Sequence, residues 1–189
     1  MRKWSKSQAK EWFSKQPWLV GCNFLPSSAI NQLEMFQSET FDSDTLKREV
    51  RWASQLGFNT LRVYLHDLLW QEDSAGFCKR LSYFLNICTE HKIRPILVLF
   101  DDCHRDDPIL GVQPLPVAGV HNSGWKQSPG KNLVDAINKD IASNNEVKRL
   151  KDFVQGVMNH FSKDDRILMW DIYNEPGQFG RGEKSLKLL

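Results

Sequence analysis

The sequence predicts an α/β fold built on a parallel sheet. Four short apolar segments, each bounded by polar residues, have the composition of strands. Amphipathic segments with a period of about 3.6 residues separate them. Because the two kinds of segment alternate along the chain, we expect parallel pairing with right-handed crossovers.

The predicted strands are rich in Ile, Leu, Val and aromatic residues. They cover residues 18–24 (WLVGCNF), 59–65 (NTLRVYL), 94–100 (RPILVLF) and 167–173 (ILMWDIY). Polar residues or prolines bound each segment, which is typical of strand ends.

Amphipathic helices are expected between these strands. They cover residues 44–56, 75–91 and 146–161, and a short extra helix is expected within residues 28–37. In the first helix Leu46, Val50, Ala53 and Leu56 form the apolar face, and Gly57 ends it. Residues 1–17 form a helical lead-in.

The segment from Asp101 to about Asn145 is the one irregular stretch. It is rich in Pro and Gly, and it is long for a connection in a compact domain. It follows the carboxyl end of the third strand, where parallel α/β folds place their sites. We therefore expect this segment to be functional.

The composition is that of an ordinary globular chain. Hydrophobic residues make up 41 % and charged residues 25 %. The 25 basic and 23 acidic residues give a net charge of +2, which argues against a dedicated nucleic-acid binder. Seven Trp and eleven Phe indicate a large aromatic core or a cleft lined with flat rings.

The chain shows no sign of membrane insertion or of secretion. The apolar run Ile96–Phe100 is far shorter than the roughly 20 residues of a membrane span. Met1 to Gln16 has no apolar core of a signal peptide. We expect a cytoplasmic protein, or a secreted one if the N-terminus is incomplete. The four cysteines are expected to be reduced thiols, because none forms a C-x-x-C pair.

The predicted fourth strand ends in a motif with chemical meaning. Asn174, Glu175 and Pro176 follow it directly. A carboxylic acid at this position can protonate the leaving oxygen of a glycoside, and the adjacent amide can hold a sugar hydroxyl. The motif therefore points to glycoside hydrolysis.

Several stretches together resemble glycoside hydrolase clan A, and family 5 in particular. They are LVGCNF, LGFNTLRVYLHDLLW, ILVLFDDCH and ILMWDIYNEP, with PSSAINQLEMFQ and GVHNSGWKQSPG similar to a cellulase-like subgroup. The resemblance runs from about Trp18 to Gly180. It implies a TIM (β/α)₈ barrel of which residues 18–189 supply only the first four βα units, a half barrel.

The resemblance also implies a retaining mechanism without cofactor or metal. Glu175 matches the acid/base, Asn174 its substrate-contacting neighbour, and Arg62 the arginine that supports the nucleophile. The other positions expected to reach the sugar are Asn23, His66, Trp70, Asp102, His104, His121 and Trp125. Trp125 is either a stacking platform or a residue that packs its loop. Trp52 and Trp170 are expected in the core.

Arg62 interrupts an apolar strand, so it needs a carboxylate partner if it is buried. The resemblance places that carboxylate, the nucleophile, on a seventh strand that no position of this sequence matches. We therefore expect Arg62 to lack a partner within the chain, so that Arg62→Met would be stabilising. An arginine at a solvated strand edge is the alternative.

The Asp101–Asp107 segment allows other interpretations. Asp101, Asp102, His104, Asp106 and Asp107 have the donor types of a divalent metal site. Contacts to the sugar and a plain solvated loop are the other two interpretations of this segment. A single His with loose spacing is not a zinc signature.

A complete barrel needs eight units and about 250 residues. A half barrel leaves one sheet face and two edges uncovered, so we expect either self-association or a missing C-terminal half. The leading function is a retaining hydrolase of β-linked polysaccharides or glycosides. A non-catalytic carbohydrate binder and a metal-dependent hydrolase are the alternatives, and the sequence does not specify the glycan.

Overall fold

The computed structural model describes residues 3–103 and 107–177. His104 and Asp106 lie outside these residues. The elements, in chain order, are α1 (Lys6–Ser14), β1 (Gly21–Asn23), α2 (Gln32–Phe36), α3 (Ser43–Gln55), β2 (Thr60–Tyr64), α4 (Asp67–Glu90), β3 (Ile96–Asp101), α5 (Lys131–Asn138), α6 (Asn144–Phe161) and β4 (Met169–Asn174).

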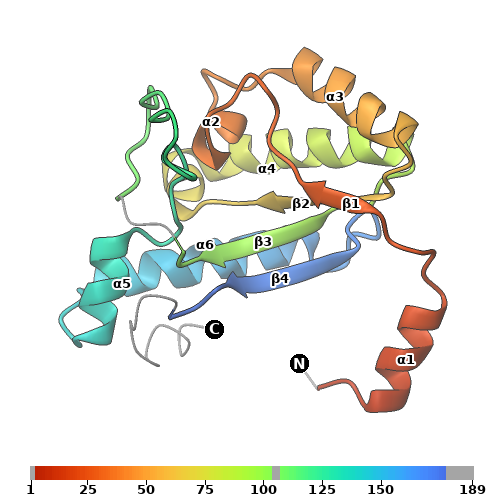
Figure 1. Ribbon diagram of the computed structural model, residues 1–189. Coiled ribbons are helices and arrows are strands. Elements are labelled where there is room, and N and C mark those ends of the chain that lie inside the picture. Colours follow the sequence, from red (N-terminus) through yellow and green to blue (C-terminus); the bar gives the residue numbers. More distant parts are fainter. Residues whose placement is uncertain (1–2, 104–106, 178–189) are drawn as a thin grey trace.

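The four strands form one parallel sheet in the order β1-β2-β3-β4. All arrowheads point the same way in Figure 1, so the carboxyl ends of the strands meet at one edge of the sheet. The predicted α/β class and the parallel pairing are confirmed. Each of the four predicted strands overlaps an observed one. β3 and β4 each end one residue later than predicted, and the first strand is the most shortened, to Gly21–Asn23.

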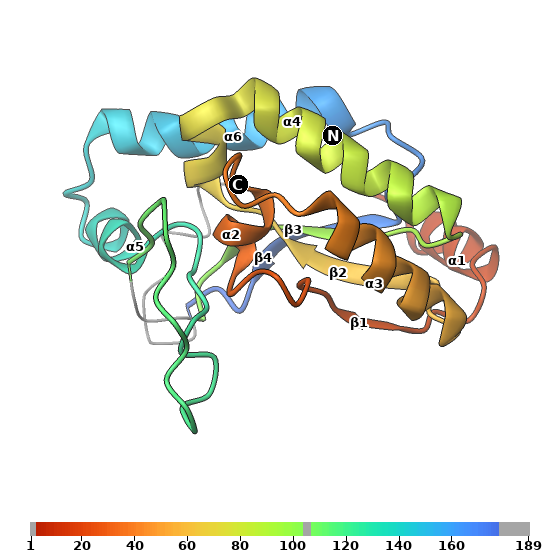
Figure 2. The same ribbon diagram turned by 90° about the horizontal axis from the view of Figure 1, so that it is seen from above.

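The hydrophobic core lies between the sheet and the helices α3, α4 and α6, which pack on the same side of the sheet (Figure 2). Leu46 of α3, Phe84 of α4 and Phe153 of α6 share one buried cluster with Leu61 and Leu97 of the strands. Burial of these side chains is the main stabilising contribution to this arrangement.

Helix α4 begins earlier than its apolar pattern predicted, at Asp67 rather than residue 75. Asp73 has non-helical backbone angles and interrupts the helix. Its carboxylate accepts a hydrogen bond from the Gly76 amide at 2.8 Å, as an N-cap does. The pattern therefore detected the second part of a kinked helix and missed the first turns.

Two predicted core positions on α3 are wrong. Leu56 follows the last helical residue and is 75 % exposed. Trp52 is 49 % exposed, and the Arg48 guanidinium lies 5.3 Å from its ring centroid. Helix α5 was not expected at all, because it lies inside the stretch interpreted as a loop.

The four cysteines are free thiols, as expected. Cys78 and Cys88 lie on the same helix, α4. Among the described residues, no helix is long and apolar enough to cross a membrane.

One face and both edges of the sheet are open in the part of the chain that the structure describes (Figure 2). All three residues of β1 are exposed, and so are Trp18 and Val20, which precede β1, and Ile172 of β4. This matches the expected consequence of a sheet with helices on one side only.

Candidate active site

The site lies at the carboxyl edge of the sheet, where all four strands contribute a polar side chain. Arg62 of β2 stands at its centre. Its guanidinium donates to Asp171 of β4 through Nε at 3.1 Å and also through Nη2. It further donates to Asn174 Oδ1 at 2.8 Å and to Asn23 Oδ1 at 3.3 Å. The guanidinium thus joins β1, β2 and β4.

The expectation that Arg62 lacks a partner in this chain is wrong. Asp171 interrupts the fourth strand just as Arg62 interrupts the second, and the two side chains are 25 % and 29 % exposed. Burial opposes the charge of Arg62, but the hydrogen bond to Asp171 and the neighbouring Tyr64 outweigh it and raise the pKa of Arg62. The strand therefore tolerates the arginine because its counter-charge is supplied locally.

Tyr64 lies beneath the guanidinium, whose Cζ is 4.8 Å from the ring centroid. The phenol oxygen accepts a hydrogen bond from Arg62 Nη1. Burial raises the pKa of Tyr64 to about 12, against the effect of Arg62, which lowers it. Tyr64 therefore stays a neutral phenol that supports the guanidinium from one side.

Asn174 is held by both ends of its side-chain amide. Its Oδ1 accepts from Arg62, and its Nδ2 lies 3.3 Å from Asp101 Oδ1 and 3.3 Å from Cys103 Sγ. Asp101 Oδ2 in turn accepts from the Trp125 indole at 3.0 Å. These contacts fix the direction of the amide beside the residue that follows it, Glu175.

Trp125 packs its loop onto the sheet. Its ring meets Tyr64 edge-to-face, with centroids 5.1 Å apart. The Cys103 thiol donates to Asp101 at 2.7 Å. Burial and then Asp101 raise the pKa of Cys103, so the thiol stays protonated.

Glu175 stands directly after β4 and is exposed. Its φ is +48°, in the left-handed region that few non-glycine residues adopt. The chain beyond it is anchored, because the Gly177 amide donates to Asp102 Oδ2 at 3.1 Å.

The structure separates the remaining predicted site residues. Asn23 is exposed and lies within the site. His121 is exposed on the loop, and among the described residues it makes no contact with the Arg62 network. His66 and Asp102 are 0 % exposed, so the prediction that they reach a sugar is wrong for this structure.

Both buried residues have structural roles instead. His66 caps α4, where its Nδ1 accepts from the Leu68 amide at 3.2 Å, and its Nε2 lies 3.0 Å from the Gln127 carbonyl oxygen. Asp102 lies 3.3 Å from Gln127 Nε2 and holds the segment after Glu175.

Sequence reasoning assigned no role to Asp171 or Tyr64. The signal for Asp171 was present, because a lone carboxylate inside an apolar strand needs a partner as much as a lone arginine does. Among residues 3–103 and 107–177, no group of three or more His, Cys, Asp or Glu side chains could hold a metal ion.

Comparison with known proteins gave two matches. The family model described as Cellulase (glycosyl hydrolase family 5) matches residues 24–187. Among solved structures, the fold is similar to exo-beta-1,4-mannosidase Op5Man5 from Opitutaceae bacterium strain TAV5, with a TM-score of 0.54 and 20 % identity. That match covers 86 % of this chain and 26 % of the mannosidase, so this chain spans about a quarter of its length. No curated protein matches the chain.

Proposed function

Because the chain belongs to glycosyl hydrolase family 5, we propose that it carries the acid/base half of a retaining glycosidase active site. The observation that supports this most directly is the placement of Asn174 and Glu175 at the end of β4, with the Asn174 amide held by Arg62 and Asp101. Glu175 is the proton donor to the leaving oxygen, and Asn174 orients the sugar beside it.

The nucleophile comes from outside residues 1–189. A retaining enzyme needs its two carboxyl groups about 5–5.5 Å apart. Asp101 and Asp102 are the other acids at a strand end near Glu175, but Asp101 accepts hydrogen bonds from Cys103 and Trp125 on its two oxygens. Asp102 is 0 % exposed and anchors Gly177. Neither is positioned to attack a sugar.

Further βα units complete the barrel at the open edges of β1 and β4. They are supplied by a C-terminal half or by a second copy of the chain. The observed register predicts how two copies would meet. Gly21 aligns with Thr60, and continuation of the pairings through β3 aligns it with residue 167, two positions before β4.

A barrel of shear 8 shifts this register by about four residues in each half. The register can shift in two directions, and only one of them lets β4 of one copy overlap β1 of the other. That shift places residue 171 opposite Gly21 of the second copy. Ile172 then lies opposite Cys22, and both are exposed in the single chain.

The substrate class is a β-linked glycoside. The solved relative is described as an exo-β-1,4-mannosidase, so β-mannosides belong in the first assay together with β-glucosides and β-xylosides. We expect residues 1–189 alone to show no turnover of the aryl glycosides. A barrel completed by four further units should turn them over, and Glu175→Gln should abolish this on poor leaving groups.

Glu72→Gln is the matched control, since Glu72 is an exposed carboxylate on α4. Turnover by the isolated chain that is lost in Glu175→Gln would contradict the proposed absence of the nucleophile, and Asp101 would be the next residue to substitute. Sugar binding without turnover in the completed barrel would favour a non-catalytic carbohydrate binder, for which the exposed Asn23 is the supporting observation.

A further inference from the structure

A groove lies between α1 and the start of β4, at the end of the sheet away from the Arg62 network. Its volume is about 470 Å³. Trp4 and Trp12 line it from the side of α1, and residues 167–170 line it from the side of β4. We propose that this groove is a docking site for Trp18 of a second copy of the chain. The inference rests on the completion of the barrel described under the proposed function.

The charged side chains around the groove hold its wall in place. Arg94 donates to the backbone carbonyl of Asp165 at 3.0 Å and to that of Ile167 at 3.1 Å. Asp164 pairs with Arg166 at 2.5 Å. Because these charges are engaged with the segment that leads into β4, the aromatic and aliphatic side chains of the groove favour an apolar occupant.

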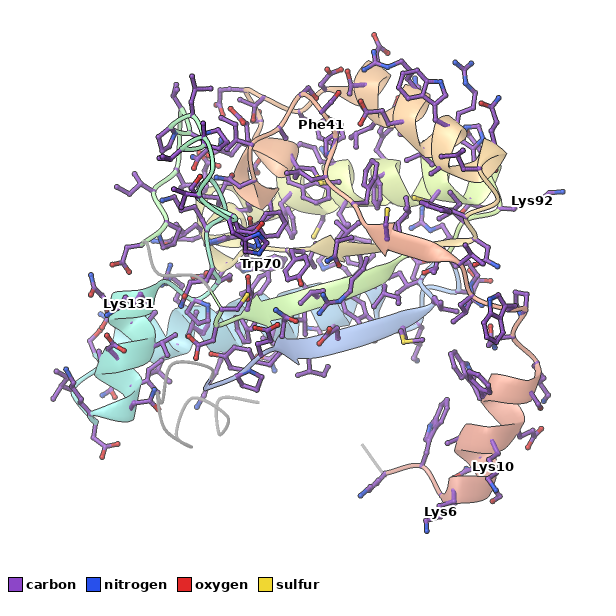
Figure 3. All side chains as sticks on the ribbon, viewed as in Figure 1. Lys6, Lys10, Phe41, Trp70, Lys92 and Lys131 are labelled. Carbon is purple, nitrogen blue, oxygen red and sulfur yellow. The ribbon has the colours of Figure 1, made fainter. Side chains whose placement is uncertain are left out.

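Helix α1 has an aromatic side that faces the groove. The Trp4 and Trp12 rings lie 6.2 Å apart between centroids, whereas Lys6 and Lys10 lie on the side of the helix away from the sheet (Figure 3). None of the residues of α1, which the structure describes in full, is buried. Because a short helix gains most of its stability from packing, a further apolar group in the groove would complete the packing of α1.

Trp18 is the exposed side chain that can supply this group. It is 87 % exposed, yet its backbone is fixed by Asn59. The Asn59 side chain donates to the Trp18 carbonyl at 2.8 Å and accepts from the Val20 amide at 2.9 Å. The segment before β1 therefore continues the direction of that strand. A backbone that is already fixed lowers the entropy cost of covering the indole.

The register proposed for two copies brings this indole to the groove. Residue 171 of one copy lies opposite residue 21 of the other, so three positions earlier Leu168 lies opposite Trp18. Leu168 is one of the residues that line the groove. Paired strands lie about 4.8 Å apart, which is within reach of a tryptophan side chain.

The two side chains also share a face of the sheet. Residues two apart on a strand point to the same face, so Trp18 follows Cys22, whose partner Leu61 belongs to the core under the helices. Leu168 follows Trp170, which packs against the same core. The indole of the second copy therefore meets the groove on the face that carries the helices.

A second copy is the partner that these positions favour. The same chain carries the exposed indole before β1 and the groove before β4, at places that the register pairs. In a two-fold arrangement each copy gives one indole and one groove, so two identical contacts close the assembly. Buried tryptophans of this kind are typical anchors of protein interfaces.

The test is sedimentation equilibrium of residues 1–189, which measures the dissociation constant of the dimer. Trp18→Ala removes an exposed indole, and Trp12→Ala removes part of the groove from a helix without buried residues. We expect each variant to raise the dissociation constant by about tenfold or more. Trp52→Ala is the matched control, because Trp52 is an exposed tryptophan on α3 and does not line the groove.

The double variant tests the contact itself. Because Trp18→Ala and Trp12→Ala remove the same contact, the double variant should bind about as weakly as the weaker single variant. Losses that multiply in the double variant would overturn the seat of Trp18 in this groove.

The remaining outcomes separate the groove from the proposed active site. A dimer that is unchanged in Trp18→Ala overturns the inference, since the copies then meet elsewhere. A monomer at every concentration also overturns it and leaves the acid/base proposal standing with a C-terminal half. A Trp18 effect on the dimer together with no Glu175-dependent turnover in any completed barrel supports the groove and contradicts the proposed function alone.

Discussion

Replacement of Arg62 by methionine tests the central contact of the site. Methionine keeps an unbranched apolar stem but is shorter and has no charge, so Asp171 loses its ion-pair partner and Asn174 Oδ1 loses its donor. Breaking a fully buried pair costs about 3–5 kcal/mol, whereas an exposed pair contributes about 0–1 kcal/mol. With side chains 25 % and 29 % exposed, this pair lies between the two limits.

We expect Arg62→Met to lower the free energy of unfolding by about 2 kcal/mol. For a chain of this size, each kcal/mol lowers the melting temperature by about 2–4 °C, so the melting temperature should fall by about 4–8 °C. Differential scanning calorimetry and urea unfolding measure both quantities. Arg51→Met is the control, because Arg51 is exposed on α3.

The double-mutant cycle with Asp171→Leu isolates the pair. A coupling energy of about 1 kcal/mol or more is expected, because the two side chains share two hydrogen bonds. If Arg62→Met melts at or above the temperature of the unchanged chain, the guanidinium is a net burden on the fold. The sequence-based expectation that Arg62→Met is stabilising would then hold, and the reasoning above would be refuted.

Three further predictions concern other parts of the molecule. Glu175→Gln in a completed barrel should reduce kcat by orders of magnitude on poor leaving groups but much less on activated aryl glycosides, which need little protonation; equal losses on both would exclude the acid role. Burial lowers the pKa of His66 below its ordinary 6.5, against the attraction of Asp67. The contribution of neutral His66 to the free energy of unfolding should therefore be fully present above about pH 6.5 and be lost as the pH falls below it. His66→Asn should flatten that decrease in urea midpoints, and an unchanged profile would contradict it. If two copies close one barrel, light scattering should give twice the chain mass. The Ile172→Cys variant should then form an intermolecular disulfide with Cys22. A monomer with no cross-link would leave a C-terminal half as the way to complete the barrel.

Local pattern was sufficient for much of the fold. The strands, the helices α3 and α6 and their alternation follow from apolar composition and a 3.6-residue period, and all are present in the structure. The position of Glu175 at the end of β4 also follows from a contiguous motif. These features depend on residues that are close together in the sequence, which is why they were predictable.

Tertiary structure decided which side chains meet. Arg62 and Asp171 are 109 residues apart, and only the parallel pairing through β3 brings them into contact. The packing of α3, α4 and α6 likewise decides three other features. They are the burial of His66, the exposure of Leu56 and the contact of the Trp70 ring with Gly156. Residue type and spacing determine whether a segment can form a helix or a strand. Which side chains come into contact is decided by packing between segments that lie far apart in the sequence.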